Sequence, residues 1–162
     1  MFPPDLIRLA EKVLAAACER QLRIATAESC TGGLIAACLT EIPGSSDVME
    51  CGFVVYSDEA KSALLGVPAE LIDRYGAVSE EVARAMSEGA LKRCRAQVCI
   101  AVTGIAGPAG GSLLKPVGLV HIAIAFAGRP VERERHRFGD IGRDQVRLKT
   151  VEAALRLLLR GL

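Results

Sequence analysis

The sequence predicts an α/β fold in which helices cover both faces of one mixed, mostly parallel β-sheet, giving three α/β/α layers. Apolar segments of strand length alternate with segments whose apolar residues recur at helical spacing. Two neighbouring strands near the C-terminal end are joined by a short turn, which adds an antiparallel portion to the sheet. Because two domains within 162 residues would each have little interior, we expect one domain over residues 1–162.

A helix, a strand and a second helix are predicted at the start of the chain. Residues 5–20 place apolar side chains at steps of three and one, which gives a helix one apolar face. The short apolar run at 22–26 predicts a strand, and a turn containing glycine separates it from a helix near 32–41. Pro43 and Gly44 are expected to break that helix.

One strand and three helices are predicted next. Residues 48–56 are apolar and rich in residues that favour strands. Ser57, followed by two acidic residues, is typical of a helix N-terminus, and Gly66 is expected to end that helix. A short helix over 68–75 and an amphipathic helix that starts at Ser79 follow.

The last part of the chain is predicted to complete the sheet. Residues 98–102 form a strand of the buried type, which leads into a glycine-rich loop over 103–111. Residues 117–127 and 131–138 are typical of a hairpin, whose second strand carries alternating charges and is expected at an exposed edge. A final helix is predicted over 141–159.

Composition excludes several classes of function. Twenty Lys and Arg residues against nineteen Asp and Glu give a net charge of +1, which supplies no long-range field for nucleic acid or an anionic membrane. The N-terminus lacks a secretory signal, and no apolar run is long enough to span a bilayer, so we expect a cytoplasmic protein. The six cysteines form no C-x-x-C pair and histidine is scarce, which favours reduced thiols over zinc.

Three polar segments follow predicted strands and are the candidates for a site. They begin at Ser29, at Tyr56 and at Thr103. In sheets of this kind, ligands bind beyond the carboxyl ends of the strands, where loops and helix N-termini converge. Because every strand–helix unit has such a loop, position alone raises the odds of a site only modestly.

Ser29 and Lys61 are the candidate nucleophile and base. A serine hydroxyl is a weak nucleophile unless a base removes its proton, and Ser-Lys pairs are a known variant of that arrangement. His121 and His136 lie in or beside predicted strands and are more simply structural. Lys61 acts as a base only when it is uncharged, which requires burial or nearby cations. The alternative is a solvated cation on a helix.

Other residues near these segments are further candidates, and two of them have two interpretations each. Tyr56 either relays a proton between serine and lysine or simply ends its strand. Thr103 and the amides of the following glycine loop can bind a developing oxyanion. Arg143 either cradles a phosphate at the start of the last helix or pairs with a neighbouring aspartate. Cys30 is read as a small packing residue beside the nucleophile.

The segments together resemble one known family. They are AESCTGG at 27–33, YSDEAK at 56–61, YGAVS at 75–79, TGIAGP at 103–108, KPVG at 115–118 and FGDIGR at 138–143. This ordered set is similar to the CinA C-terminal domain family, and the likeness extends roughly from Leu6 to Leu159. Stand-alone members of the family are nicotinamide-nucleotide amidohydrolases, which convert nicotinamide mononucleotide to its nicotinic acid form.

The resemblance implies a role for each candidate. Ser29 is then the nucleophile, Lys61 the base and Tyr56 a neighbour that handles protons. Thr103 assists at the amide oxygen and Arg143 holds the 5′-phosphate. The residues implied to bind substrate are Cys30, Thr31, Gly32, Gly33, Gly104, Gly107 and Arg143. The resemblance implies no metal and no cofactor, and the expected partner is a small-molecule substrate, with no nucleic acid and no membrane.

Two departures from the family pattern stand out. Asp58 occupies a position that is commonly Asn, which alters a hydrogen bond near Lys61. Ser112-Leu113-Leu114 replaces a more polar stretch and makes the loop more apolar. A homo-oligomer, most simply a dimer, is expected. Two alternatives stay open: a non-catalytic nucleotide-binding module, regulatory or linked to competence, and an amidase for another small amide.

Overall fold

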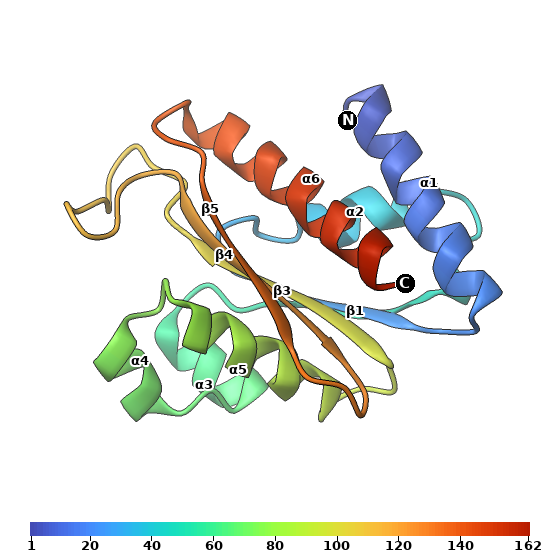
Figure 1. The fold of residues 1–162 in the computed structure, drawn as a ribbon, viewed down its shortest axis with the longest axis horizontal. Coiled ribbons are helices and arrows are strands. Elements are labelled where there is room, and N and C mark those ends of the chain that lie inside the picture. Colours follow the sequence, from blue (N-terminus) through green and yellow to red (C-terminus); the bar gives the residue numbers. More distant parts are fainter.

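The protein is described by a computed structural model that covers residues 1–162 and has the predicted three layers (Figure 1). Its elements, in chain order, are α1 (Pro4–Glu19), β1 (Ile24–Glu28), α2 (Leu34–Thr40), a 3₁₀ turn η1 (Ser45–Asp47), β2 (Met49–Val54), α3 (Asp58–Leu65), α4 (Ala69–Tyr75), α5 (Glu80–Leu91), β3 (Val98–Gly104), β4 (Leu119–Phe126), β5 (Glu132–Arg137) and α6 (Arg143–Gly161).

The five strands form one mixed sheet in the order β2-β1-β3-β4-β5. Strand β1 pairs in parallel with β2 and β3, whereas β4 is antiparallel to β3 and β5. Only β4 therefore runs against the other strands, and the prediction of a mixed, mostly parallel sheet is confirmed. The carboxyl ends of β1, β2 and β3 meet at the same edge of the sheet.

Helices cover both faces of this sheet. Figure 1 shows α1, α2 and α6 above it and α3, α4 and α5 below it. Each face has its own apolar core: the larger includes Leu155 and Leu158 of α6, and the smaller includes Val82 and Met86 of α5. Each such side chain, when fully buried, contributes about 1.5–3 kcal/mol of hydrophobic free energy.

The shift from prediction that bears on the site concerns β1. Residues 22–26 were expected in this strand, but it runs from Ile24 to Glu28 and all its residues are buried. Gln21, in a left-handed conformation with φ of 55°, forms the turn after α1, so pairing with β3 begins only at Ile24. The acidic side chain of Glu28 thus lies inside the strand instead of in the loop.

The helix boundaries on the lower face follow the predicted capping residues. The Ser57 hydroxyl accepts a hydrogen bond from the Ala60 amide, and the Ser79 hydroxyl accepts one from the Val82 amide. Gly66 ends α3 in the left-handed conformation, with φ of 68°. These three signals were correct because each acts through its own local backbone.

Close packing between α5 and α3 positions the helix that carries Lys61. Gly89 of α5 lies so near the backbone of Leu65 that a Cβ atom there would collide with the Leu65 carbonyl oxygen. The absence of a side chain at Gly89 therefore allows α3 to pack closely against α5, and Lys61, which lies one turn before Leu65 on α3, is buried.

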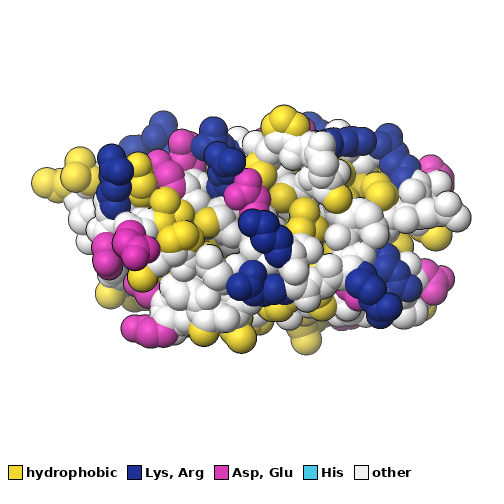
Figure 2. Space-filling view, turned by 90° about the horizontal axis from the view of Figure 1, so that it is seen from below, with side chains coloured by type: hydrophobic (Ala, Val, Ile, Leu, Met, Phe, Trp, Pro, Cys, Tyr) yellow, Lys and Arg dark blue, Asp and Glu magenta, His cyan; other side chains and the backbone are white.

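The lower face of the molecule carries charges of both signs. Figure 2 shows the side covered by α3, α4 and α5, where basic and acidic side chains are interspersed. No helix combines the length and apolar character needed to cross a bilayer.

Candidate active site

A cavity of about 270 Å³ lies at the carboxyl ends of β1, β2 and β3. The chain brings eight of the eleven predicted site residues to its lining: Ser29, Cys30, Tyr56, Lys61, Thr103, Gly104, Gly107 and Arg143. They come from four segments that are far apart in the sequence. The strand order places these segments together because β1 lies between β2 and β3.

Ser29 is fixed by its backbone. It follows the last residue of β1, its amide donates to the Val102 carbonyl at 3.1 Å, and its carbonyl accepts from the Gly32 amide at 3.0 Å. Side chains alternate along a strand, and Ala25 and Ala27 lie in the core on the lower face. Continuing that alternation directs Ser29 toward the face that carries α3 and Lys61.

Lys61 is buried, with 1% of its surface exposed. Its Nζ donates to the carbonyl oxygens of Tyr56 at 3.2 Å and Ser57 at 3.4 Å. The Asp58 carboxylate lies 3.5 Å from the same nitrogen. The alternative that Lys61 is a solvated helix cation is therefore wrong, and the substituted position Asp58 acts directly on this amine.

Arg143 closes one side of the cavity. Its guanidinium donates to the Tyr56 hydroxyl at 3.0 Å and to the Gly107 carbonyl at 2.8 Å. It thus joins the start of α6 to the end of β2 and to the glycine-rich loop, instead of pairing with Asp140 or Asp144. Tyr56 is exposed and directs its hydroxyl to this contact.

Thr103 is used differently from the prediction. Its buried hydroxyl donates to the Ala77 carbonyl at 2.8 Å, which ties the end of β3 to the segment before α5. The neighbouring Gly104 packs against β4 so closely that a Cβ would lie 2.9 Å from the Leu119 carbonyl oxygen. Both residues shape the cavity wall.

Thr31, Gly32 and Gly33 are not brought to the cavity lining. The Thr31 hydroxyl and the Gly33 amide both donate to the carboxylate of Glu28. Gly32 lies against the guanidinium of Arg147, which donates to the Thr31 carbonyl at 2.9 Å. The polar groups of the turn at 31–33 are therefore bound by Glu28 and Arg147 of the chain itself, not directed into the cavity.

Cys30 lines the cavity but packs into the core of the upper face. Burial raises the pKa of its thiol to about 12. A thiol with this pKa is protonated at neutral pH and is a poor nucleophile.

Neither histidine lines the cavity. His121 is buried in β4, where burial lowers its pKa. His136 of β5 shares a hydrogen bond of 2.8 Å with Glu134. No three His, Cys, Asp or Glu side chains lie where they could hold a metal ion together.

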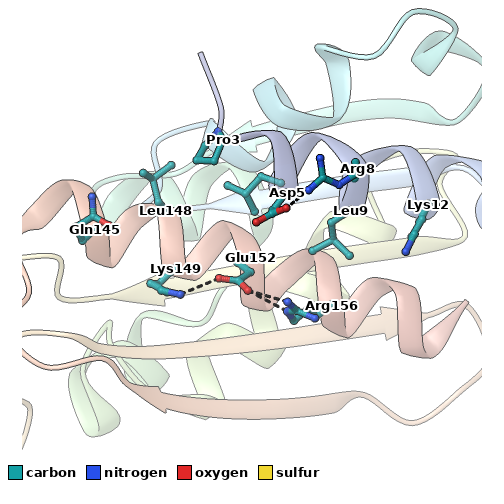
Figure 3. A pocket seen from close by; sticks show the side chains of 11 residues that line it. Pro3, Asp5, Arg8, Leu9, Lys12, Gln145, Leu148, Lys149, Glu152 and Arg156 are labelled. Atoms are coloured by element: carbon teal, nitrogen blue, oxygen red, sulfur yellow. Dashed lines mark hydrogen bonds and ion pairs between the residues drawn. The ribbon is translucent and has the colours of Figure 1, made fainter.

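A wider groove of about 480 Å³ runs between α1 and α6 (Figure 3). Five of its six charged side chains pair with one another: Glu152 binds Lys149 and Arg156, and Arg8 binds Asp5, whereas Lys12 has no ion-pair partner. The groove contains no serine, threonine, cysteine or histidine, so the cavity at the strand ends is the candidate active site.

Comparisons with known proteins agree with the sequence motifs. The profile described as the CinA C-terminal domain matches residues 6–162. CinA-like proteins of Akkermansia muciniphila and Anaeromyxobacter sp. (strain K) are 53% and 48% identical over 134 and 150 residues, which is 83% and 93% of this chain. The chain spans only 32% and 36% of the length of these relatives.

Solved structures show the same fold. The competence/damage inducible protein CihA from Agrobacterium tumefaciens matches with a TM-score of 0.97 and 50% identity, covering 99% of this chain and 97% of that one. A CinA superfamily protein from Escherichia coli matches with a TM-score of 0.92 and 35% identity, covering 100% and 94%. The chain belongs to the CinA C-terminal domain family.

Proposed function

We propose that the protein is an amidohydrolase that converts nicotinamide mononucleotide into nicotinic acid mononucleotide and ammonia, with Ser29 as nucleophile and Lys61 as base. One observation carries this proposal: a serine hydroxyl and a buried lysine amine line the same small cavity. The shared cavity places a hydroxyl and an amine at one site, as the Ser-Lys variant of nucleophilic catalysis requires.

The first half of the reaction transfers the acyl group to the enzyme. The Ser29 oxygen attacks the carboxamide carbon while its proton passes to the Lys61 amine. The tetrahedral intermediate then expels the amide nitrogen, which takes that proton from Lys61 and leaves as ammonia. The product of this half is an ester between Ser29 and the nicotinoyl group.

The second half hydrolyses this ester. Lys61 removes a proton from a water molecule, which attacks the ester carbon, and the proton returns to the Ser29 oxygen. Asp58 and the two carbonyl oxygens of Tyr56 and Ser57 hold the amine in place throughout.

Arg143 is the proposed ligand of the 5′-phosphate. A guanidinium offers a planar set of N–H donors that matches phosphate oxygens. Arg143 uses only two of these donors in hydrogen bonds within the chain, so the others can bind a phosphate. Tyr56, which accepts one of these bonds, orients the guanidinium. Because the net charge is +1, anion binding depends on such a local group.

The test is ammonia release by the purified chain from nicotinamide mononucleotide, from the riboside and from other small amides. Ser29→Ala and Lys61→Met should each abolish release. Ser46→Ala and Lys92→Met alter exposed residues outside the cavity and should leave it unchanged.

The outcomes separate the three hypotheses. Ammonia from the mononucleotide supports the proposal. If the unaltered protein and its variants bind the mononucleotide but none of them releases ammonia, the non-catalytic module would be favoured. Cleavage of other amides alone would refute the substrate assignment and retain the mechanism.

A further inference from the structure

Glu28 is a fully buried carboxylate beside the proposed nucleophile. It is the last residue of β1 and has 0% of its surface exposed. Ile24, four residues earlier on the same side of the strand, belongs to the core of the upper face. Glu28 therefore points toward α2, on the opposite side of the sheet from the direction assigned to Ser29.

The Glu28 carboxylate accepts four hydrogen bonds at the start of α2. Its Oε2 accepts from the Thr31 hydroxyl at 2.6 Å and from the amides of Gly33 and Ile35 at 3.0 Å each. Its Oε1 accepts from the Ala36 amide at 2.9 Å. Gly33, the N-cap residue of α2, has no side chain to perform this task.

A glycine-rich turn at a helix N-terminus ordinarily offers its free N–H groups to a bound anion. Here the chain's own carboxylate occupies that position. A substrate phosphate therefore finds no free donors at Gly33, Ile35 or Ala36, which leaves phosphate binding to Arg143.

The remaining amides of the turn differ in whether they have a hydrogen-bond acceptor within the chain. The Gly32 amide donates to the Ser29 carbonyl at 3.0 Å, and the Leu34 amide donates to the Thr31 carbonyl at 3.3 Å. The amides of Cys30 and Thr31 have no backbone acceptor. Of these two residues, Cys30 follows Ser29 directly and lines the cavity, at the position where acyl-transfer enzymes place a donor for an oxyanion.

We infer that Glu28 is the positioning residue of the Ser29 turn, holding it so that the Cys30 amide faces the oxyanion of the acyl-transfer step. The inference rests on the proposed function. By binding four donors at once, Glu28 fixes the turn from one side while Arg147 holds the Thr31 carbonyl from α6. Displacement of such donors weakens stabilisation of the transition state.

The first test measures covalent reaction of Ser29 in the full chain with a fluorophosphonate. The Ser29 oxygen bonds to phosphorus, fluoride leaves, the serine proton passes to Lys61, and the P=O oxygen mimics the oxyanion. Intact mass gives the rate. Glu28→Gln should slow labelling by about tenfold or more, whereas Glu41→Gln, an exposed residue at the end of α2, should not change it.

Steady-state kinetics provide a readout that a loss of stability would not mimic. In folded Glu28→Gln, kcat for ammonia release should fall while KM changes by less than about threefold, because the substrate-binding groups are untouched. Equal labelling rates for Glu28→Gln and the unaltered protein would overturn the inference.

A second variant serves if Glu28→Gln does not fold. Thr31→Val removes only the 2.6 Å hydrogen bond and should slow labelling by about threefold. A rate equal to that of the unaltered protein would contradict the role of Glu28. Absence of labelling in the unaltered protein would instead contradict the proposed function.

Amide NMR of the labelled protein locates the donors. The proton resonance of the Cys30 amide should move downfield when the P=O group binds it. An unchanged Cys30 resonance, with shifts at 104–110 instead, would place the oxyanion donors in the glycine-rich loop and overturn the inference that Glu28 positions the Cys30 amide.

Discussion

The Tyr56 hydroxyl accepts a 3.0 Å hydrogen bond from Arg143, although 87 positions separate the two residues. The contact joins the segment after β2 to the first residue of α6 at the rim of the cavity. It leaves the hydroxyl proton of Tyr56 free and orients the guanidinium that we assign to phosphate.

Removal of this contact should weaken phosphate recognition selectively. Tyr56→Phe should raise KM for nicotinamide mononucleotide by about three- to tenfold, because Arg143 loses one of its two partners. Arg143→Ala should raise it further. The riboside, which has no phosphate, is the control substrate, and equal losses for both substrates would remove Arg143 from phosphate binding.

Asp58 should restrain the proposed base. Its carboxylate lies 3.5 Å from the Lys61 nitrogen, and this ion pair competes with transfer of the serine proton to the amine. Asp58→Asn removes the ion pair and should therefore raise kcat for ammonia release from nicotinamide mononucleotide. A fall in kcat would show that Asp58 assists the base by another route.

Cys30 should be unreactive in the folded protein. Burial raises the pKa of its thiol to about 12, whereas Cys18 is exposed. Iodoacetamide at pH 8 should modify Cys18 well before Cys30, as read by peptide mass. Cys30→Ala should retain ammonia release within about threefold, because the residue acts as a small apolar side chain. Loss of activity in step with Cys30 alkylation would argue for a thiol nucleophile.

His121 should make stability depend on pH. Burial lowers its pKa below the ordinary value of 6.5, so the unfolded chain takes up a proton that the folded chain does not. Stability is therefore lost as pH falls through about 6.5 toward the folded pKa. The charges around it are Arg135 and Lys115, which reinforce the shift, and Glu80 and Glu81, which oppose it.

Urea unfolding measured between pH 7.5 and 5 checks this expectation. The unfolding free energy of the unaltered protein should decrease more steeply on acidification than that of His121→Gln. Parallel curves for the two proteins would show that His121 protonates equally in both states.

Much of the fold was predictable because its signals are local. Periodicity, strand-favouring residues and Pro or Gly signals predicted the six α-helices and five strands but not the 3₁₀ turn η1, and the hydroxyl caps at Ser57 and Ser79 placed two helix starts correctly. The boundaries of β1 were shifted because an acidic residue is usually read as the end of a strand. Glu28 is buried there only because backbone amides of α2 satisfy it, and those partners have no sequence signature.

The candidate site was predictable in composition but not in its contacts. Eight predicted residues share one cavity, since the strand order brings their loops together. The close approach of α3 to α5 depends on Gly89, and the partner of Thr103 is a carbonyl 26 positions away. Such long-range contacts are not encoded in spacing along the chain.

Cooperation between the hydroxyl of Ser29 and the amine of Lys61 is tested by ammonia release from nicotinamide mononucleotide in four proteins: unaltered, Ser29→Ala, Lys61→Met and the double variant. When two groups act as one unit, removal of either abolishes the effect of both. The rate of ammonia release should therefore fall by about 10³-fold or more in each single variant, and by no more than that in the double variant. Losses that multiply, or a Ser29→Ala variant as active as the unaltered protein, would contradict the Ser/Lys mechanism.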